Sequence, residues 1–110
     1  MLFDEWRSDV KYTKGNIVRH KDNIYRIGQD HTSQTQWIPG ETGTESLYSL
    51  IHIDEGGYEV WKAWDGISGI YKQYQIVRDP NDNKLYKSEI PNNVWGPPHE
   101  QPMYWKLYEE

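Results

Sequence analysis

A chain of 110 residues is long enough for one ordinary domain or two very small ones, and six Trp, nine Tyr and one Phe make 15% of it aromatic. Cys is absent, which excludes disulfides, thiolate metal sites and a Cys nucleophile. The net charge of −5 argues against a nucleic-acid partner, which needs a basic face, and the lack of a long apolar run argues against a membrane partner.

Both halves of the chain predict a β-hairpin made of two short strands. The four strands are expected at residues 16–20, 23–27, 74–78 and 84–88. Lys21-Asp22 is predicted to form the first turn, and residues 79–83, which contain Pro, Asp and Asn, the second. One Ala and nine Gly do not suit a helical bundle, so the fold class expected is all-β.

The sequence contains an internal repeat, with similar residue spacings in its two halves. Trp-x-Pro occurs as Trp37-Ile38-Pro39 and again as Trp95-Gly96-Pro97, and a Tyr-to-Val step of six residues occurs in each half. Because self-similarity of this kind marks repeated modules, we predict two small tandem modules at residues 1–53 and 58–110. Residues 54–57, which are polar and contain two Gly, are predicted to be a short linker.

Most of the aromatic rings are expected in the core, because aliphatic residues are scarce and each buried ring removes roughly 150–250 Å² from water. The residues assigned to the core lie on or beside the predicted strands. They are Trp6, Tyr12, Val18, Tyr25 and Tyr48 in the first half, and Trp64, Tyr71, Val77, Tyr86 and Trp105 in the second.

No catalytic or metal-binding motif stands out. The 17 carboxylates are scattered along the chain, and nucleophile, phosphate-loop and dinucleotide patterns are missing. Residues 79–83 resemble the start of a calcium loop, but Lys84 and Ile90 stand where that pattern needs Gly and Glu. We therefore expect no enzyme, no metal and no cofactor, and a hydrolytic enzyme is the least supported function.

Trp37 and Trp95 differ from the other aromatic residues, because each lies in a polar loop and is followed by x-Pro, which stiffens the backbone. We expect both indoles to be exposed; the alternative is a lid over the core. A flat indole face stacks on the apolar C–H face of a sugar ring, and neighbouring polar groups can hydrogen-bond the sugar hydroxyls. The candidate neighbours are His31, Thr32, Ser33, Gln34, Asn92 and Asn93.

At these residues the first half resembles carbohydrate-binding module families 5 and 12, the chitin-binding type 3 domains. The match runs over about residues 4 to 51 and comprises Trp6, Tyr12, Gly15, Val18, Tyr25, His31-Thr32-Ser33 and Trp37-Ile38-Pro39. The second half resembles the family more loosely, as a divergent copy. There Tyr74 replaces the Gly, two residues are added before Tyr86, and Asn92-Asn93 replace His-Thr-Ser.

The resemblance implies small twisted antiparallel sheets with aromatic cores and non-catalytic binding of chitin or a related cell-wall polysaccharide. It implies that Trp37, and less directly Trp95, contacts the sugar. Such modules usually accompany a secreted hydrolase and also occur in phage tail proteins. The expected partner is therefore a polysaccharide or other glycan, with a hydrolase or a phage tail protein as the larger assembly.

The alternative function is a structural or receptor-binding accessory module of a phage or prophage tail protein that contacts protein or host glycan. An extracellular or virion-associated location is expected in either case. No secretory signal peptide is visible in this chain.

Overall fold

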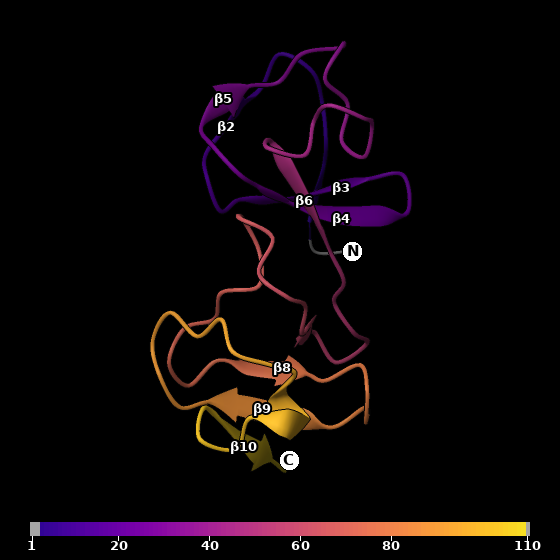
Figure 1. Cartoon of the computed structure of the whole chain (residues 1–110). Coiled ribbons are helices and arrows are strands. Elements are labelled where there is room, and N and C mark those ends of the chain that lie inside the picture. The colour runs from indigo at the N-terminus through magenta and orange to yellow at the C-terminus, as the bar shows by residue number, and fades with distance from the viewer. Residues whose placement is uncertain (1–2, 110) are drawn as a thin grey trace. The chain divides into compact units, whose positions relative to one another are not determined.

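The computed structural model describes residues 3–109, and its regular structure there is β-strand apart from one short 3-10 helix (Figure 1). The all-β prediction is therefore confirmed. The chain divides into two compact units between Ile51 and His52. The strands of the first unit are β1 (Asp4–Glu5), β2 (Lys11–Tyr12), β3 (Ile17–His20), β4 (Asn23–Ile27), β5 (His31–Thr32) and β6 (Tyr48–Ile51). The elements of the second unit are β7 (Glu59–Val60), β8 (Ile76–Arg78), β9 (Leu85–Ser88), η1 (Pro98–Glu100) and β10 (Trp105–Tyr108).

The first unit is built on a four-stranded sheet in the order β1-β3-β4-β6, with a separate two-stranded sheet of β2 and β5. β1 pairs parallel with β3, and the other pairs are antiparallel. The β3–β4 hairpin forms where the sequence predicts it, with Val18 opposite Tyr25. Both side chains are buried on the same face, because directly opposite residues of an antiparallel pair point the same way.

The second unit has a four-stranded sheet in the order β7-β8-β9-β10. Here too the first pair is parallel and the next two pairs are antiparallel, so the two units share this pattern of strand pairing. The β8–β9 turn is longer than the β3–β4 turn. Asn83 closes it with a positive φ of 61° and donates its backbone N–H to the carbonyl of Asp79 at 2.8 Å.

Each unit has a small core of its own, in which rings supply much of the volume. In the first, Val18, Tyr25, Ile27 and Tyr48 are buried, with Trp6, Tyr12 and Leu47 packed against them. In the second, Tyr71, Val77 and Trp105 are buried, with Trp61, Tyr86 and Tyr104 packed against them.

The core assignment of Trp64 is wrong, because this side chain is 48% exposed. Trp61 takes the position that Trp6 holds in the first unit. The backbone N–H of Trp6 donates to the carbonyl of Arg19, and the N–H of Trp61 donates to that of Arg78. The residue after the parallel edge strand is thus the core tryptophan in both units, and sequence spacing alone selects a residue three positions too late.

Residues 54–57, predicted as a linker, form a turn within the second unit. The Asp54 carboxylate accepts the Tyr58 N–H at 2.8 Å and pairs with the Arg78 guanidinium at 2.9 Å. The N–H of Asp54 donates to the carbonyl of Tyr58. The segment is therefore hydrogen-bonded to the start of β7 and the end of β8. In the described part of the chain, no helix has the length and apolar character needed to cross a membrane.

Candidate carbohydrate-binding surfaces

The first candidate surface is the loop that carries Trp37, whose side chain is 43% exposed. Its backbone N–H donates to the carbonyl of Gln34 at 3.0 Å, which closes a turn. Pro39 is buried, and Gly40 lies so close to Tyr25 that an added Cβ would stand 2.5 Å from the phenol oxygen. The loop is thus anchored on the core two residues after Trp37, while the indole itself reaches solvent.

His31 lies in β5 and is held by two hydrogen bonds. Its Nδ1 lies 2.9 Å from the carbonyl of Gln29 and its Nε2 lies 3.0 Å from the hydroxyl of Tyr48. Because a carbonyl only accepts, Nδ1 carries the proton in the neutral ring and Nε2 accepts from Tyr48. The same hydroxyl accepts the indole N–H of Trp6 at 2.9 Å, and burial raises its pKa. His31 is therefore fixed in orientation by the core.

Thr32 and Ser33 follow His31 but differ in accessibility. Thr32 is exposed, whereas Ser33 is completely buried. The Ser33 hydroxyl donates to the carbonyl of Arg7 and accepts the N–H of Val10. Ser33 thus ties β5 to the chain ahead of β2, and its hydroxyl lies out of a ligand's reach.

A shallow cavity of about 330 Å³ beside the β2–β5 pair brings two of the predicted residues together. His31 and Thr32 line it with Tyr12, and Lys11, Thr13 and Asp30 complete the wall. Positively charged, negatively charged and neutral polar side chains therefore surround the ring of Tyr12, which suits hydrogen bonding to a polyhydroxylated ligand. Trp37 is not part of this wall.

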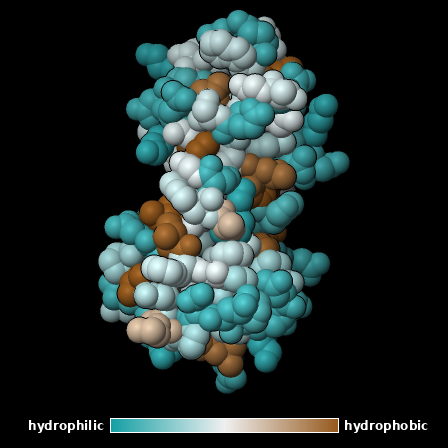
Figure 2. All heavy atoms as spheres, in the orientation of Figure 1, coloured by the Kyte–Doolittle hydropathy of each residue, from teal (hydrophilic) through white to brown (hydrophobic). Residues whose placement is uncertain are grey.

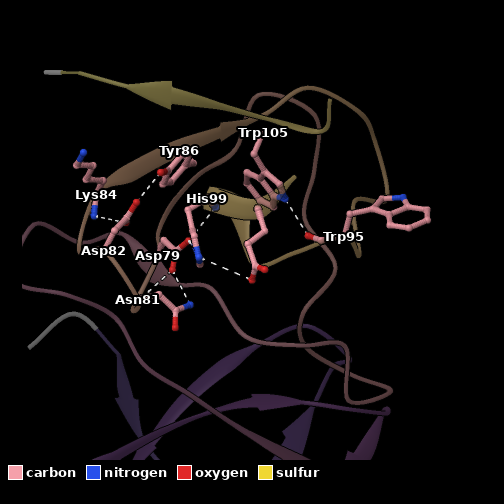
Figure 3. Close-up of polar contacts among 9 residues, drawn as sticks. Asp79, Asn81, Asp82, Lys84, Tyr86, Trp95, His99 and Trp105 are labelled. Carbon is pink, nitrogen blue, oxygen red and sulfur yellow. Dashed lines mark hydrogen bonds and ion pairs between the residues drawn. The ribbon is translucent and has the colours of Figure 1, made fainter. Parts of the chain in front are cut away.

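The second candidate surface is built around Trp95, which is 48% exposed. Its indole stacks on the ring of Tyr104 with the centroids 4.7 Å apart and the planes 9° from parallel. The Trp95 N–H donates to the side chain of Asn93 at 3.1 Å, and its carbonyl accepts the Trp105 indole N–H at 2.8 Å. In Figure 3 the Trp95 indole extends away from the other labelled side chains.

Gly96 brings the chain close to a second tryptophan. An added Cβ there would stand 2.2–2.6 Å from three atoms of the Trp61 indole, so a side chain at this position has no room. The Gly96–Pro97 peptide bond is cis. Trp61 Nε1 is buried without a hydrogen-bond partner among the described residues, unlike the matching atom of Trp6.

Asn92 and Asn93 have different roles. Asn92 is exposed and has a positive φ of 51°. Asn93 is completely buried and donates its amide to the Ser88 hydroxyl at 2.9 Å and to the carbonyl of Tyr104 at 3.0 Å. Asn93 faces Tyr71 as His31 faces Tyr12, so Asn93 rather than Asn92 occupies the position of His31.

Sequence reasoning missed a polar cluster next to the Trp95 loop (Figure 3). Asp79, which follows β8, is completely buried and accepts from the backbone N–H of His99 at 3.0 Å and from its Nδ1 at 2.8 Å. The other carboxylate oxygen of Asp79 accepts from the backbone and side-chain nitrogens of Asn81. Asp79 and His99 are 20 residues apart, and no spacing rule links them.

The charges of this cluster support one another. Burial acts to raise the pKa of Asp79, but the hydrogen bonds from Asn81 and His99 outweigh it and lower that pKa. The hydrogen bond to Asp79 raises the pKa of His99 above its usual 6.5. Burial and a hydrogen bond to Asp82 raise the pKa of Tyr86 to about 12. The pair of Asp79 and His99 is thus an ion pair at mildly acidic pH.

The surface holds no single large apolar face in the view of Figure 2, where brown side chains form small separate groups among hydrophilic ones. Exposed rings do occur outside the two loops, at Trp64 and Tyr74, and Met103 is 78% exposed. No group of three or more His, Cys, Asp or Glu within residues 3–109 is placed to hold a metal ion.

Two half-exposed indoles on braced loops of small β-sheets, beside polar side chains, are the features of a small module that binds through aromatic surfaces. The model of carbohydrate-binding module family 5/12 matches residues 5–62, which is just over half of the chain. The chain belongs to this family, whose members bind carbohydrate. No curated protein matches the chain.

Proposed function

We propose that this protein binds chitin or a related cell-wall polysaccharide, with Trp37 as the main stacking surface and Trp95 as a second one. The observation that carries the proposal is the partial exposure of both indoles, 43% and 48%, on loops anchored to the cores. Little conformational entropy is lost when a sugar ring stacks on a side chain that is already held.

The polar neighbours divide into residues that can touch a ligand and residues that position others. Thr32 and His31 line the β2–β5 cavity, and Asn92 is exposed. Ser33 and Asn93 are buried and support the backbone. We expect Thr32 and Asn92 to hydrogen-bond sugar hydroxyls or amides, and His31, whose two ring nitrogens are already hydrogen-bonded, to contact the ligand through its ring.

We further propose that residues 58–110 form a divergent copy of the first module. The shared pattern of strand pairing supports this, as do matched hydrogen bonds: the Tyr12 hydroxyl accepts the N–H of Arg7, and the Tyr71 hydroxyl accepts that of Lys62. The family match ends at residue 62, so this copy rests on the geometry.

The test is retention of the full chain on insoluble chitin, with Trp37→Ala and Trp95→Ala singly and together. Loss of a central aromatic anchor costs about 2 kcal/mol, which weakens binding about thirtyfold. We expect Trp37→Ala to lose most of the binding and the double variant to lose the rest. Trp64→Ala is the matched control, because this indole is also 48% exposed but belongs to neither loop. Equal retention of folded Trp37→Ala and wild-type chains would refute the assignment.

A second candidate function is attachment to a larger protein, a hydrolase or a phage tail protein, in an extracellular or virion-associated setting. The exposed Tyr74 favours it, since Tyr is enriched among the side chains that anchor protein interfaces. A glycan array combined with gel filtration separates the two functions. A stable oligomer that binds no glycan would support this second candidate.

A further inference from the structure

We propose that Asp79 and His99 are positioning residues that hold the Trp95 loop in its sugar-binding conformation. The inference rests on the proposed function of Trp95 as a stacking surface. Neither residue is placed to stack on the ligand; each acts through the backbone that carries Trp95.

The first step of the argument is that Asp79 is a fixed anchor. It lies directly after β8, is completely buried, and its own backbone N–H donates to the carbonyl of Lys84 at 2.9 Å. Asn81 holds its other carboxylate oxygen. A buried carboxylate with this many donors cannot move without leaving several hydrogen bonds unmade.

The second step is that His99 joins this anchor to the loop. One oxygen of Asp79 receives both the backbone N–H and the side-chain Nδ1 of His99, at 3.0 and 2.8 Å. His99 lies in η1, where the N–H of Glu100 donates to the carbonyl of Pro97 at 3.0 Å. The anchor therefore fixes the 3-10 turn as well as the imidazole.

The third step is that the turn fixes Trp95. Only Gly96, Pro97 and Pro98 separate Trp95 from His99, and two prolines leave that segment little rotational freedom. Pro98 is buried, and Gly96 lies against Trp61. At the other end, Asn93 and Trp105 hold the backbone of Trp95. The loop is thus held at both ends, by Asn93 and Trp105 at Trp95 and by Asp79 at His99.

The charged groups that face His99 are Asp79, Glu100 and Asp82, all of them acidic. Glu100 Oε2 lies 3.7 Å from Nε2, and Asp82 is held by the Tyr86 hydroxyl of β9. All three carboxylates favour protonation of His99, and they outweigh the opposing effect of burial. Loss of that proton converts the ion pair with Asp79 into a weaker hydrogen bond from a neutral imidazole to the carboxylate.

The sign of the pH dependence follows from these groups. The pKa of His99 is raised in the folded state, so its contribution is complete below 6.5 and is lost as pH rises through the folded value. The pKa of Asp79 is lowered, so its contribution is complete above 3.8 and is lost as pH falls through its folded value. The loop is held most firmly between these two limits.

The experiment uses the full chain and follows the indole N–H resonance of Trp95 by NMR as a function of pH, with Trp95→Phe to assign it. We expect the resonance to titrate with His99 in the wild type. In His99→Asn the side-chain amide can still donate to Asp79 but does not ionise, so the resonance should not titrate. His52→Asn, at an exposed histidine of the same unit, is the matched control and should behave as the wild type.

Binding is the second readout, measured with a soluble chitin hexamer in a Trp37→Ala background that isolates the Trp95 surface. We expect the affinity to fall about three- to tenfold as His99 deprotonates, because a neutral imidazole holds the Asp79 carboxylate less firmly than an imidazolium does. His99→Asn should remove this dependence while keeping measurable affinity. Asp79→Asn should weaken binding at every pH, and the NMR spectrum shows whether that variant is folded.

The outcomes separate the two proposals. A Trp95 resonance that does not follow His99, or that titrates equally in His99→Asn, would overturn the positioning role even if the hexamer binds. A resonance that follows His99 in a Trp37→Ala chain that binds no hexamer would support the positioning role and refute sugar binding at Trp95.

Discussion

At the scale of single residues, the two units differ in whether the indole N–H of the core tryptophan has a hydrogen-bond acceptor. In the first, the Tyr48 hydroxyl serves the indole N–H of Trp6 and the Nε2 of His31. In the second unit, Trp105 occupies the position of Tyr48: the backbone N–H of Tyr48 donates to the carbonyl of Thr44, and that of Trp105 donates to the carbonyl of Gln101. The Trp105 side chain has no hydroxyl that could accept a hydrogen bond. The indole N–H of Trp61 is consequently left without an acceptor.

Tyr48→Phe is predicted to destabilise the first unit by about 1–3 kcal/mol, because two partly buried partners, Trp6 and His31, lose their hydrogen bond together. Hydrogen exchange of the β3 and β4 amides measures the change. Tyr25→Phe is the control, since within residues 3–109 the Tyr25 hydroxyl accepts one long hydrogen bond, from Asn23 at 3.5 Å. Equal protection in both variants would show that the Tyr48 network adds nothing.

Gly96→Ala is predicted to destabilise the second unit by about 1–3 kcal/mol, because the new methyl group would overlap the Trp61 indole. Thermal unfolding measures the change. Gly56→Ala provides the control, as a Cβ there meets its nearest neighbour at an ordinary 3.4 Å. A Gly96→Ala chain as stable as the control would show that Trp61 moves aside at little cost.

At the scale of elements, the C-terminal end of β8 organises the second unit. Arg78 holds the 54–58 turn through Asp54, and the next residue, Asp79, holds η1. Neighbouring residues at the end of one strand therefore anchor the turn that precedes β7 and the 3-10 helix that precedes β10. The equivalent strand β3 ends in a two-residue turn, and its Arg19 pairs with Glu5 of β1 instead.

Acid is predicted to destabilise the second unit through these two carboxylates. Burial acts to raise the pKa of Asp54, but the Tyr58 N–H and Arg78 lower it overall, as Asn81 and His99 do for Asp79. Both contributions are complete above 3.8 and are lost as pH falls through the folded values. Asp54→Asn should flatten the fall in stability measured by acid titration. Asp22→Asn, on an exposed turn, should leave it unchanged.

At the scale of the whole molecule, a net charge of −5 bears on which polymers can approach. Like charges repel a polyanion most strongly at low ionic strength, whereas stacking on an uncharged sugar is insensitive to salt. The charge therefore favours neutral polysaccharides over acidic ones.

We predict retention on chitin at all salt concentrations and no retention on polygalacturonate or single-stranded DNA at low salt. A pull-down with matched particles measures both. Strong low-salt binding to either polyanion would contradict the assignment of a neutral polysaccharide.

The sequence by itself determined the all-β class, the hairpins around Val18 and Val77, and the two Trp-x-Pro loops, because these depend on local composition and spacing. Only the tertiary structure decided which neighbours of those loops are accessible. Ser33 and Asn93 are buried, and their side chains hydrogen-bond backbone groups. Trp61, rather than Trp64, occupies the core position of the second unit. The tie between Asp79 and His99 joins residues far apart in the chain, and only the folded sheet brings them within hydrogen-bonding distance.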